Sequence, residues 1–261
     1  MESQSSESVE KLAGKKFIMI VEGRAVQLSS DGLSVSKEDM DMLHSTQEET
    51  DTRVVLYTLY ALSKGYKFVV VKSPDTDILL ILLYYAVKFR PVTVMFDTGR
   101  GNNRRIINIS DLAGDLGEGY CEALLGLHCF TGEDCNSAFK GKGKIGPLKK
   151  ILAKPRYQEA FRDLGNNWEV SEKTVSELEA FTCYMYGHPR ISSVNKVRAT
   201  MLKKQTGGNN SSLKHLKKVD LSRMPPCRRS LLPHINRANF RCGEFKLAHV
   251  LNPQLQDPVK M

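Results

Sequence analysis

Apolar residues gather most densely between positions 67 and 85. A β-branched run at 68–71 has the length and composition of a buried strand, and the apolar run at 78–85 suits a buried helix. Between them lie two carboxylates spaced two residues apart, Asp75 and Asp77. A strand that feeds a helix through such a turn places both aspartates at the carboxyl end of a sheet, where open α/β folds gather their chemistry. Because neighbouring carboxylates repel each other, this pair indicates a bound cation or a shared proton.

The hydrophobic pattern predicts further elements of an α/β fold around this centre. Residues 48–65 begin with acidic residues, repeat apolar ones at helical spacing and end on a glycine, which are the signs of a helix. Strands alternate with helices up to residue 109, and this order favours a largely parallel, Rossmann-like sheet with one antiparallel edge. The other predicted strands are residues 16–21, 92–96 and 105–109, the last two joined by a hairpin loop. Residues 24–47 are polar and poorly patterned, so we expect a loop there.

Beyond residue 137 the pattern is mainly helical. A short amphipathic helix is expected at 148–152, with Lys149 and Lys150 on its polar side. Further helices are expected at 157–164, 171–186 and 190–205, and near 227–242 with a bend at Pro233. These patterns divide the chain into a disordered segment at 1–15, an α/β domain at 16–155 and an α-helical C-terminal extension at 156–261 with a flexible linker near 206–212.

Charge is distributed unevenly along the chain. Residues 1–139 carry 14 Lys and Arg against 20 Asp and Glu, a net charge of −6, whereas residues 140–261 carry 24 against 9, a net of +15. An acidic part joined to a strongly basic part suits a cation-binding site beside a surface for a polyanion such as nucleic acid. The alternative is a basic helical tail that only keeps the protein soluble.

Cysteine spacing and the lack of a long apolar run bear on the compartment. The six cysteines show no close pairing of the kind that zinc sites need, and scattered single cysteines fit a reducing compartment. The first residues are polar and acidic, without the apolar region of a secretory signal, and the longest apolar run is too short to span a bilayer. We therefore expect an intracellular protein, acting in the nucleus, with no membrane partner.

Carboxylates recur at three points of the chain. Glu49 and Asp51 open the predicted helix, Asp75 and Asp77 follow the strand, and Asp134 lies in a turn after a glycine. If these five converge at one sheet edge, their repulsion requires cations, and oxygen-only ligation selects Mg²⁺ or Mn²⁺. Two such ions about 4 Å apart can activate a water and stabilise the leaving oxygen in phosphodiester cleavage.

Each acidic group taken singly is equally well explained as a helix cap or an acidic turn. Only the order and spacing of the three together favours a metal site. We expect the neighbouring Glu133 to face solvent, and we assign no role to the scattered histidines His44, His128, His188 and His234.

Three segments carry a family resemblance. ETDTR, SPDTDIL and FTGEDCNSAFKGKGKIGPLKKIL, in that order, resemble the flap endonuclease branch of the PIN-like nuclease superfamily, over roughly residues 44–155. More closely, the chain resembles a group of animal proteins with this domain that are often associated with mobile elements, whose helical C-terminal part is similar to PPCRRSLLPHINRANFRCGEF. The resemblance implies a PIN-like sheet, a helix-hairpin-helix, and hydrolysis of DNA with Mg²⁺ or Mn²⁺.

Site residues follow from this resemblance position by position. The carboxylates that match the family's catalytic, metal-binding ones are Glu49, Asp51, Asp75, Asp77 and Asp134, while Glu22 would match an aspartate that is one methylene shorter. The resemblance also implies that Gly141, Lys142 and Gly143 form the hairpin whose backbone N–H groups hold a DNA phosphate. Lys142 stands where an apolar residue is usual. Four further lysines would supply charge to this surface: Lys140, Lys144, Lys149 and Lys150.

The chain departs from the family at its N-terminal end. The family begins with a strand that carries a first aspartate, and nothing in residues 1–15 resembles it. By this comparison the nuclease-like domain is N-terminally incomplete and lacks one metal ligand. Two hypotheses remain open: a Mg²⁺-dependent, structure-selective nuclease acting on DNA phosphodiesters, or a catalytically inactive nucleic-acid-binding or protein-interaction module derived from such an enzyme.

Overall fold

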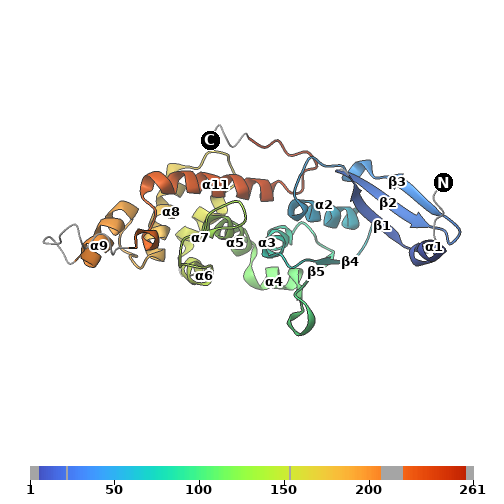
Figure 1. Ribbon diagram of the computed structural model, residues 1–261, viewed down its shortest axis with the longest axis horizontal. Helices are drawn as coiled ribbons and strands as arrows, with labels where there is room; N and C mark the ends of the chain where they lie inside the picture. Colours follow the sequence, from blue (N-terminus) through green and yellow to red (C-terminus); the bar gives the residue numbers. More distant parts are fainter. Residues whose placement is uncertain (1–5, 22, 153, 207–219, 257–261) are drawn as a thin grey trace.

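The computed structural model describes residues 6–21, 23–152, 154–206 and 220–256 as an elongated α/β molecule (Figure 1). A small sheet occupies one end of the long axis, a second sheet with its covering helices lies in the middle, and a bundle of helices forms the other end. The long helix α11 (Arg228–Lys246) runs along one side of that bundle toward the middle. Over the described residues, no helix is long and apolar enough to cross a membrane.

The first sheet is antiparallel and consists of β1 (Lys16–Val21), β2 (Arg24–Ser30) and β3 (Val35–Asp39). The expected loop at 24–47 is therefore wrong. The apolar residues of β2 are few and diluted by Gln and Ser, so no strand pattern stands out, yet Ala25 packs with Met40 and Leu43 in a small separate core.

The expected disorder of residues 1–15 is also wrong where the structure describes them. Residues Ser6–Leu12 form helix α1, and Val9 is buried. A bridge between Ala13 and Ser30 joins the end of this helix to β2. The helix thus depends on contacts with the sheet that local composition does not reveal.

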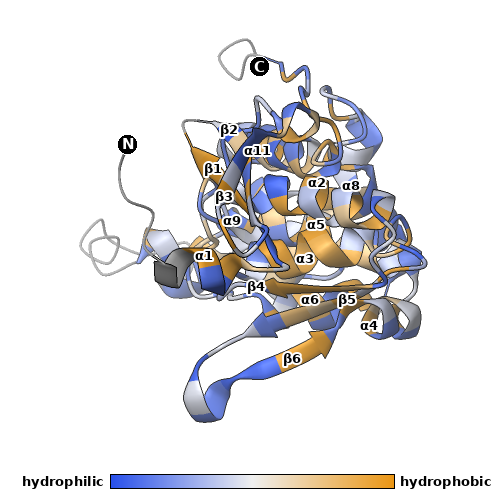
Figure 2. Ribbon diagram, turned by 90° about the vertical axis from the view of Figure 1, so that its right-hand side faces the viewer, coloured by the Kyte–Doolittle hydropathy of each residue, from blue (hydrophilic) through white to orange (hydrophobic). Residues whose placement is uncertain are grey.

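The second sheet has the strand order β4 (Phe68–Lys72), β5 (Thr93–Thr98), β6 (Arg105–Asn108). β4 and β5 are parallel, and β6 returns antiparallel as the hairpin pattern predicted. The sheet is nevertheless smaller than expected, because β1 belongs elsewhere and only one strand pair is parallel. Helices α2 (Thr50–Ser63) and α3 (Thr76–Tyr85) lie over one face (Figure 2). On β4 the side chains of Phe68 and Val70 are 58% and 54% exposed, so the other face is open.

The remaining helices build the main core. They are α4 (Ile109–Leu116), α5 (Glu118–Thr131), α6 (Ile145–Leu152), α7 (Pro155–Asp163), α8 (Glu172–Met185), α9 (Val194–Thr206) and α11, with short 3₁₀ turns at Asp41–Leu43, Gly101–Asn103 and Leu221–Arg223. Phe130, Phe161 and Phe181 meet edge to face at its centre, with ring centroids 4.9–6.4 Å apart. Helices lie close to the positions predicted for them beyond residue 156, whereas most of the predicted linker lies outside the described residues.

The segment that follows α11 fastens two distant parts of the chain. The Gln47 side chain donates to the carbonyl oxygens of Ala248 and Val250, at 3.1 and 2.5 Å. At the end of α3, the buried Tyr85 hydroxyl donates to the Lys246 carbonyl at 2.6 Å. These bonds fix the start of α2 and the end of α3 against the C-terminal end of α11. They thereby position the carboxylates at the start of α2.

A tight helix contact supplies a test of this packing. Gly126 of α5 lies against α7 so closely that an added Cβ would come within 2.1 Å of the Phe161 carbonyl oxygen, whereas Gly114 of α4 faces open space. We expect Gly126→Ala to lower the free energy of unfolding by about 2 kcal/mol, as overpacking does. The matched change Gly114→Ala should raise it by up to about 1 kcal/mol through helix propensity. Urea unfolding of both variants measures this, and a stable Gly126→Ala protein would contradict the close approach.

Candidate functional site

Two helix starts bring four of the predicted carboxylates to the same part of the molecule. Glu49 is the N-cap residue of α2, with Asp51 in the first turn. Asp75 is the N-cap residue of α3, and its side chain accepts a hydrogen bond from the Asp77 N–H at 2.9 Å. Carboxylates at these positions face the positive ends of two helix dipoles. The strand-turn-helix and acidic-helix patterns therefore predicted the placement of each pair.

The two pairs influence each other electrostatically. Partial burial, together with the negative charges of Asp75, Glu49 and Asp77, raises the pKa of Asp51 to about 6. No hydrogen-bond donor among the described residues reaches the Asp51 carboxylate to offset this repulsion. The predicted convergence of the α2 and α3 starts is thus present, and we call these four carboxylates the acidic edge.

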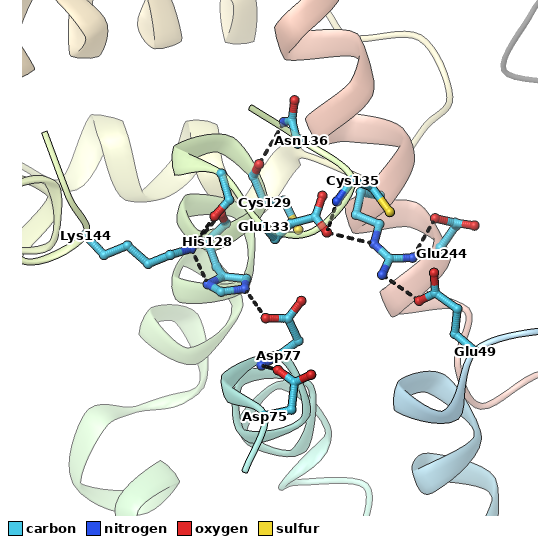
Figure 3. Close-up of polar contacts among 12 residues, drawn as sticks. Glu49, Asp75, Asp77, His128, Cys129, Glu133, Cys135, Asn136, Lys144 and Glu244 are labelled. Carbon is cyan, nitrogen blue, oxygen red and sulfur yellow. Dashed lines mark hydrogen bonds and ion pairs between the residues drawn. The ribbon is translucent and has the colours of Figure 1, made fainter. Parts of the chain in front are cut away.

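Asp77 is held by a chain of two further side chains (Figure 3). His128 of α5 donates through Nε2 to the Asp77 carboxylate at 2.7 Å, and the ammonium group of Lys144 donates to His128 Nδ1 at 2.8 Å. Lys144 also donates to the Gly132 carbonyl at 2.5 Å. Burial opposes ionisation of Asp77, but the bond from His128 and the positive charges of Lys144 and Arg241 lower its pKa. Asp77 is therefore an ionised carboxylate whose orientation is fixed.

A buried guanidinium stands on the other side of the acidic edge. Arg241 of α11 is 5% exposed and pairs with Glu49 at 2.5 Å, with Glu244 at 3.1 Å and with Glu133 at 3.3 Å. Burial alone would favour the neutral form, yet the bonds and charges of Glu49 and Glu244 raise the pKa of this group above its ordinary value. No sequence pattern indicated Arg241, because two of its three partners, Glu49 and Glu133, lie far from it in the sequence.

In the turn after α5, Glu133 is buried and Asp134 is exposed, the reverse of what we expected. Asp134 is exposed and makes no hydrogen bond or ion pair with the described residues. The Glu133 side chain, which we expected to face solvent, has 0% exposure and lies against Arg241, with Oε1 buried and without a hydrogen bond. A narrow turn closed between Glu133 and Asn136 directs the first of the two acids inward. Asp134 is thus not among the charges that act on Asp51.

Most lysines of the predicted nucleic-acid surface are already engaged. Lys142 and Lys150 lie over the rings of Tyr186 and Tyr184, at 4.1 and 4.2 Å from the centroids. Lys140 donates to Ser222 at 2.5 Å, and Lys144 holds His128. Lys149 is exposed and has no partner within the described part of the chain. Gly141 and Gly143, with φ of 72° and 54°, give the turn before α6 its left-handed backbone conformation.

The oxygens of the acidic edge are the ligand type that Mg²⁺ prefers, and Asp51 accepts no hydrogen bond from the described residues that would compete with an ion. Asp77 and Glu49, however, each give one oxygen to a cationic or imidazole partner. Across the described ranges, no three Asp, Glu, His or Cys side chains form a group that could hold a metal ion. Glu22, the further candidate, lies outside the described residues.

The raised pKa of Asp51 predicts a pH-dependent stability. Because the folded-state pKa of about 6 exceeds the ordinary 3.8, the folded protein binds this proton more tightly and loses stability as pH rises through that window. In chelator, Asp51→Asn should be more stable than wild type at pH 7.5 by about 1 kcal/mol, a figure reduced for solvent screening, and the difference should vanish near pH 4. Denaturant unfolding across pH measures it. Exposed Glu48→Gln is the control, and a pH-independent gain would contradict the prediction.

The ion pair between Arg241 and the buried Glu133 side chain predicts a second effect on stability. Arg241→Met leaves the Glu133 carboxylate buried without its counter-charge, so we expect a loss of about 3 kcal/mol in the free energy of unfolding. Adding Glu133→Gln should recover about 1 kcal/mol, since the unpaired charge is removed. Arg237→Met, one turn away and exposed, should change stability by less than about 0.5 kcal/mol. Equal effects at positions 241 and 237 would rule out the buried role of Arg241.

Comparisons with known proteins identified no relative of this chain. No family model, no characterised protein and no solved structure matches this chain. Any assignment of function therefore rests on the chemistry of the residues described above.

Proposed function

We propose that the chain is a Mg²⁺-dependent, structure-selective nuclease that hydrolyses DNA phosphodiesters at the acidic edge. The observation that carries this proposal is the Asp51 carboxylate, whose pKa is raised to about 6 by partial burial and by repulsion from the carboxylates of two helix starts. Such crowding is costly unless a cation or a proton offsets it, and perturbed carboxylates of this kind gather at functional sites.

One or two of the carboxylates of Asp51, Asp75 and Asp77 would hold the ion. The donor set is all oxygen, and Mg²⁺ commonly binds through one or two carboxylates and completes its shell with water and substrate phosphate, so a protein cage of three ligands is not required. When bound, Mg²⁺ supplies Lewis-acid activation of a water and stabilises charge on the phosphate. Asp134 is exposed and would take part only if the substrate brought its turn closer.

The chain's own residues prepare this edge for a charged ligand. His128 and Lys144 hold Asp77 ionised and in one orientation. Arg241 draws one oxygen of Glu49 away from Asp51, which limits the repulsion there. The N-terminal dipoles of α2 and α3 point at the same edge and favour negative charge, including that of a phosphate. The excess positive charge of residues 140–261 supports a nucleic-acid partner.

Cleavage assays test the proposal directly. Wild-type protein with Mg²⁺ should cut a 5′-flap DNA, and Asp75→Asn or Asp77→Asn should lower the rate at least about 100-fold, because several kcal/mol of charge stabilisation is lost. Asp115→Asn, an exposed aspartate of α4 far along the chain from the edge, should cut like wild type. As a second readout, Mn²⁺ should raise the melting temperature of wild type more than that of Asp77→Asn. Equal cutting by wild type and Asp77→Asn would refute this site.

A second candidate is a catalytically inactive nucleic-acid-binding or protein-interaction module. It is favoured by Arg241, whose guanidinium already neutralises the Glu49 side of the cluster, and by the lysines engaged with tyrosine rings. This candidate predicts DNA binding that weakens steeply as salt rises, with no cleavage in Mg²⁺ or Mn²⁺. Binding that does not depend on salt would leave only a protein-interaction role.

A further inference from the structure

A basic cavity lies on the helical part of the molecule. It encloses about 420 Å³ between the loop before α6, the end of α8, α9 and the first half of α11. This volume is in the range of small-ligand pockets. Its charged lining consists of Lys140, Arg198 and Arg237, and no acidic side chain of the described residues lines it. The buried rings of Phe139 and Tyr186 give it an apolar wall.

The cations of this cavity are not all neutralised. Lys140 has Asp220 at 3.7 Å, and Arg198 donates to the Pro225 carbonyl, which carries no full charge. Arg237 is exposed and has no hydrogen bond or ion pair with any described residue. The cavity therefore retains a net positive charge on its own lining.

The start of α11 adds to this positive potential. The Sγ atom of its N-cap residue, Cys227, lies 3.2 Å from the Ser230 Oγ of the first turn, and that turn holds no acidic residue. It holds Arg228 and Arg229 instead, the opposite of what a helix dipole favours. Arg228 is paired with Glu179, and Arg229 is exposed and does not line the cavity, so neither side chain is part of the site. Such a helix start is suited to an anion.

A buried polar group faces the same cavity. His234 is 6% exposed, and its Nε2 donates to the Phe130 carbonyl at 2.8 Å. Burial, with the charge of Arg237, lowers its pKa, so the ring is neutral and Nδ1 is an acceptor. Nδ1 has no hydrogen bond with the described residues, although the side chain lines the cavity. This nitrogen can accept from a hydroxyl group of a ligand, such as that of a sugar or a protonated phosphate.

We propose that this cavity binds a phosphate monoester of nucleotide size, with its phosphate on Arg237, Arg198 and Lys140 and a hydroxyl toward His234. The shared chemistry fits the terminal phosphate of a nucleic-acid strand and a free nucleoside monophosphate. Arg237 precedes Arg241 by one helical turn, about 6 Å along α11, so the cavity neighbours the acidic edge on the same helix. Identifying the ligand as the end of a nucleic-acid strand rests on the proposed nuclease function. The existence of a phosphate site does not depend on that function.

Binding measurements without divalent metal separate this proposal from catalysis. In chelator, a fluorescent oligonucleotide with a terminal phosphate should bind wild type roughly tenfold more tightly than the same strand with a terminal hydroxyl, the effect of one or two charge-assisted hydrogen bonds. Both the 5′ and 3′ phosphorylated strands are measured. Competition by a nucleoside monophosphate at equal affinity supports the site and assigns it to a free nucleotide. A monophosphate that competes only weakly supports a strand end.

Two arginines of α11 give a matched pair of variants. Arg237→Ala should abolish the preference for the phosphorylated strand, whereas Arg229→Ala, which removes the same charge from the same helix outside the cavity, should keep it. Both side chains are exposed and unpaired in the described structure, so neither change should unfold the protein. The proposal is overturned if wild type shows no phosphate preference, or if both variants lose it equally. Phosphate-selective binding by a protein that cuts no DNA would refute the nuclease function and leave this site standing.

Discussion

The ion pairs of Arg241 organise this molecule. One buried guanidinium bonds to the N-cap residue of α2, to a neighbour on α11 and to the turn after α5. Removing a charge of this kind leaves uncompensated carboxylates in a dry environment, which costs far more than the pair itself contributes. Arg241 therefore acts as an internal counter-ion. It lets Glu49 and Glu133 approach each other, and so it holds the first turn of α2 against α11 and the turn after α5.

A second pair of stabilising side chains, His128 of α5 and Lys144 in the turn before α6, lies on the opposite side of the acidic edge. Lys144 and His128 hold Asp77, while Arg241 holds Glu49, and Asp51 is left between them without a donor. The carboxylate whose pKa is most disturbed is thus the one that the protein does not satisfy. This arrangement supports a cationic ligand at Asp51 and Asp75 for the proposed nuclease. It equally explains how an inactive descendant could keep the fold, because two protein cations already neutralise part of the charge.

Local patterns predicted the local parts of this architecture. The β-branched run at 68–71, the acidic turn and the apolar run behind it became β4, the Asp75 cap and α3, because each depends on neighbours within a few residues. β2 and β3 were missed since their stability comes from pairing with β1 and from the small core with Met40 and Leu43. Arg241 and His128 were missed because their partners lie 192 and 51 residues away. Glu133 and Asp134 could not be told apart, since the direction of a turn decides which one is buried.

Glu49 and Arg241 lie 192 residues apart, so they are synthesised at very different times. Glu49 leaves the ribosome long before α11 does, and so do Asp75 and Asp77. During most of synthesis the acidic edge is therefore without its internal counter-ion, and Tyr85 and Gln47 lack their carbonyl partners on the last segment. Native contacts this distant form late. The charges of the nascent α/β part are therefore balanced only once α11 has been made.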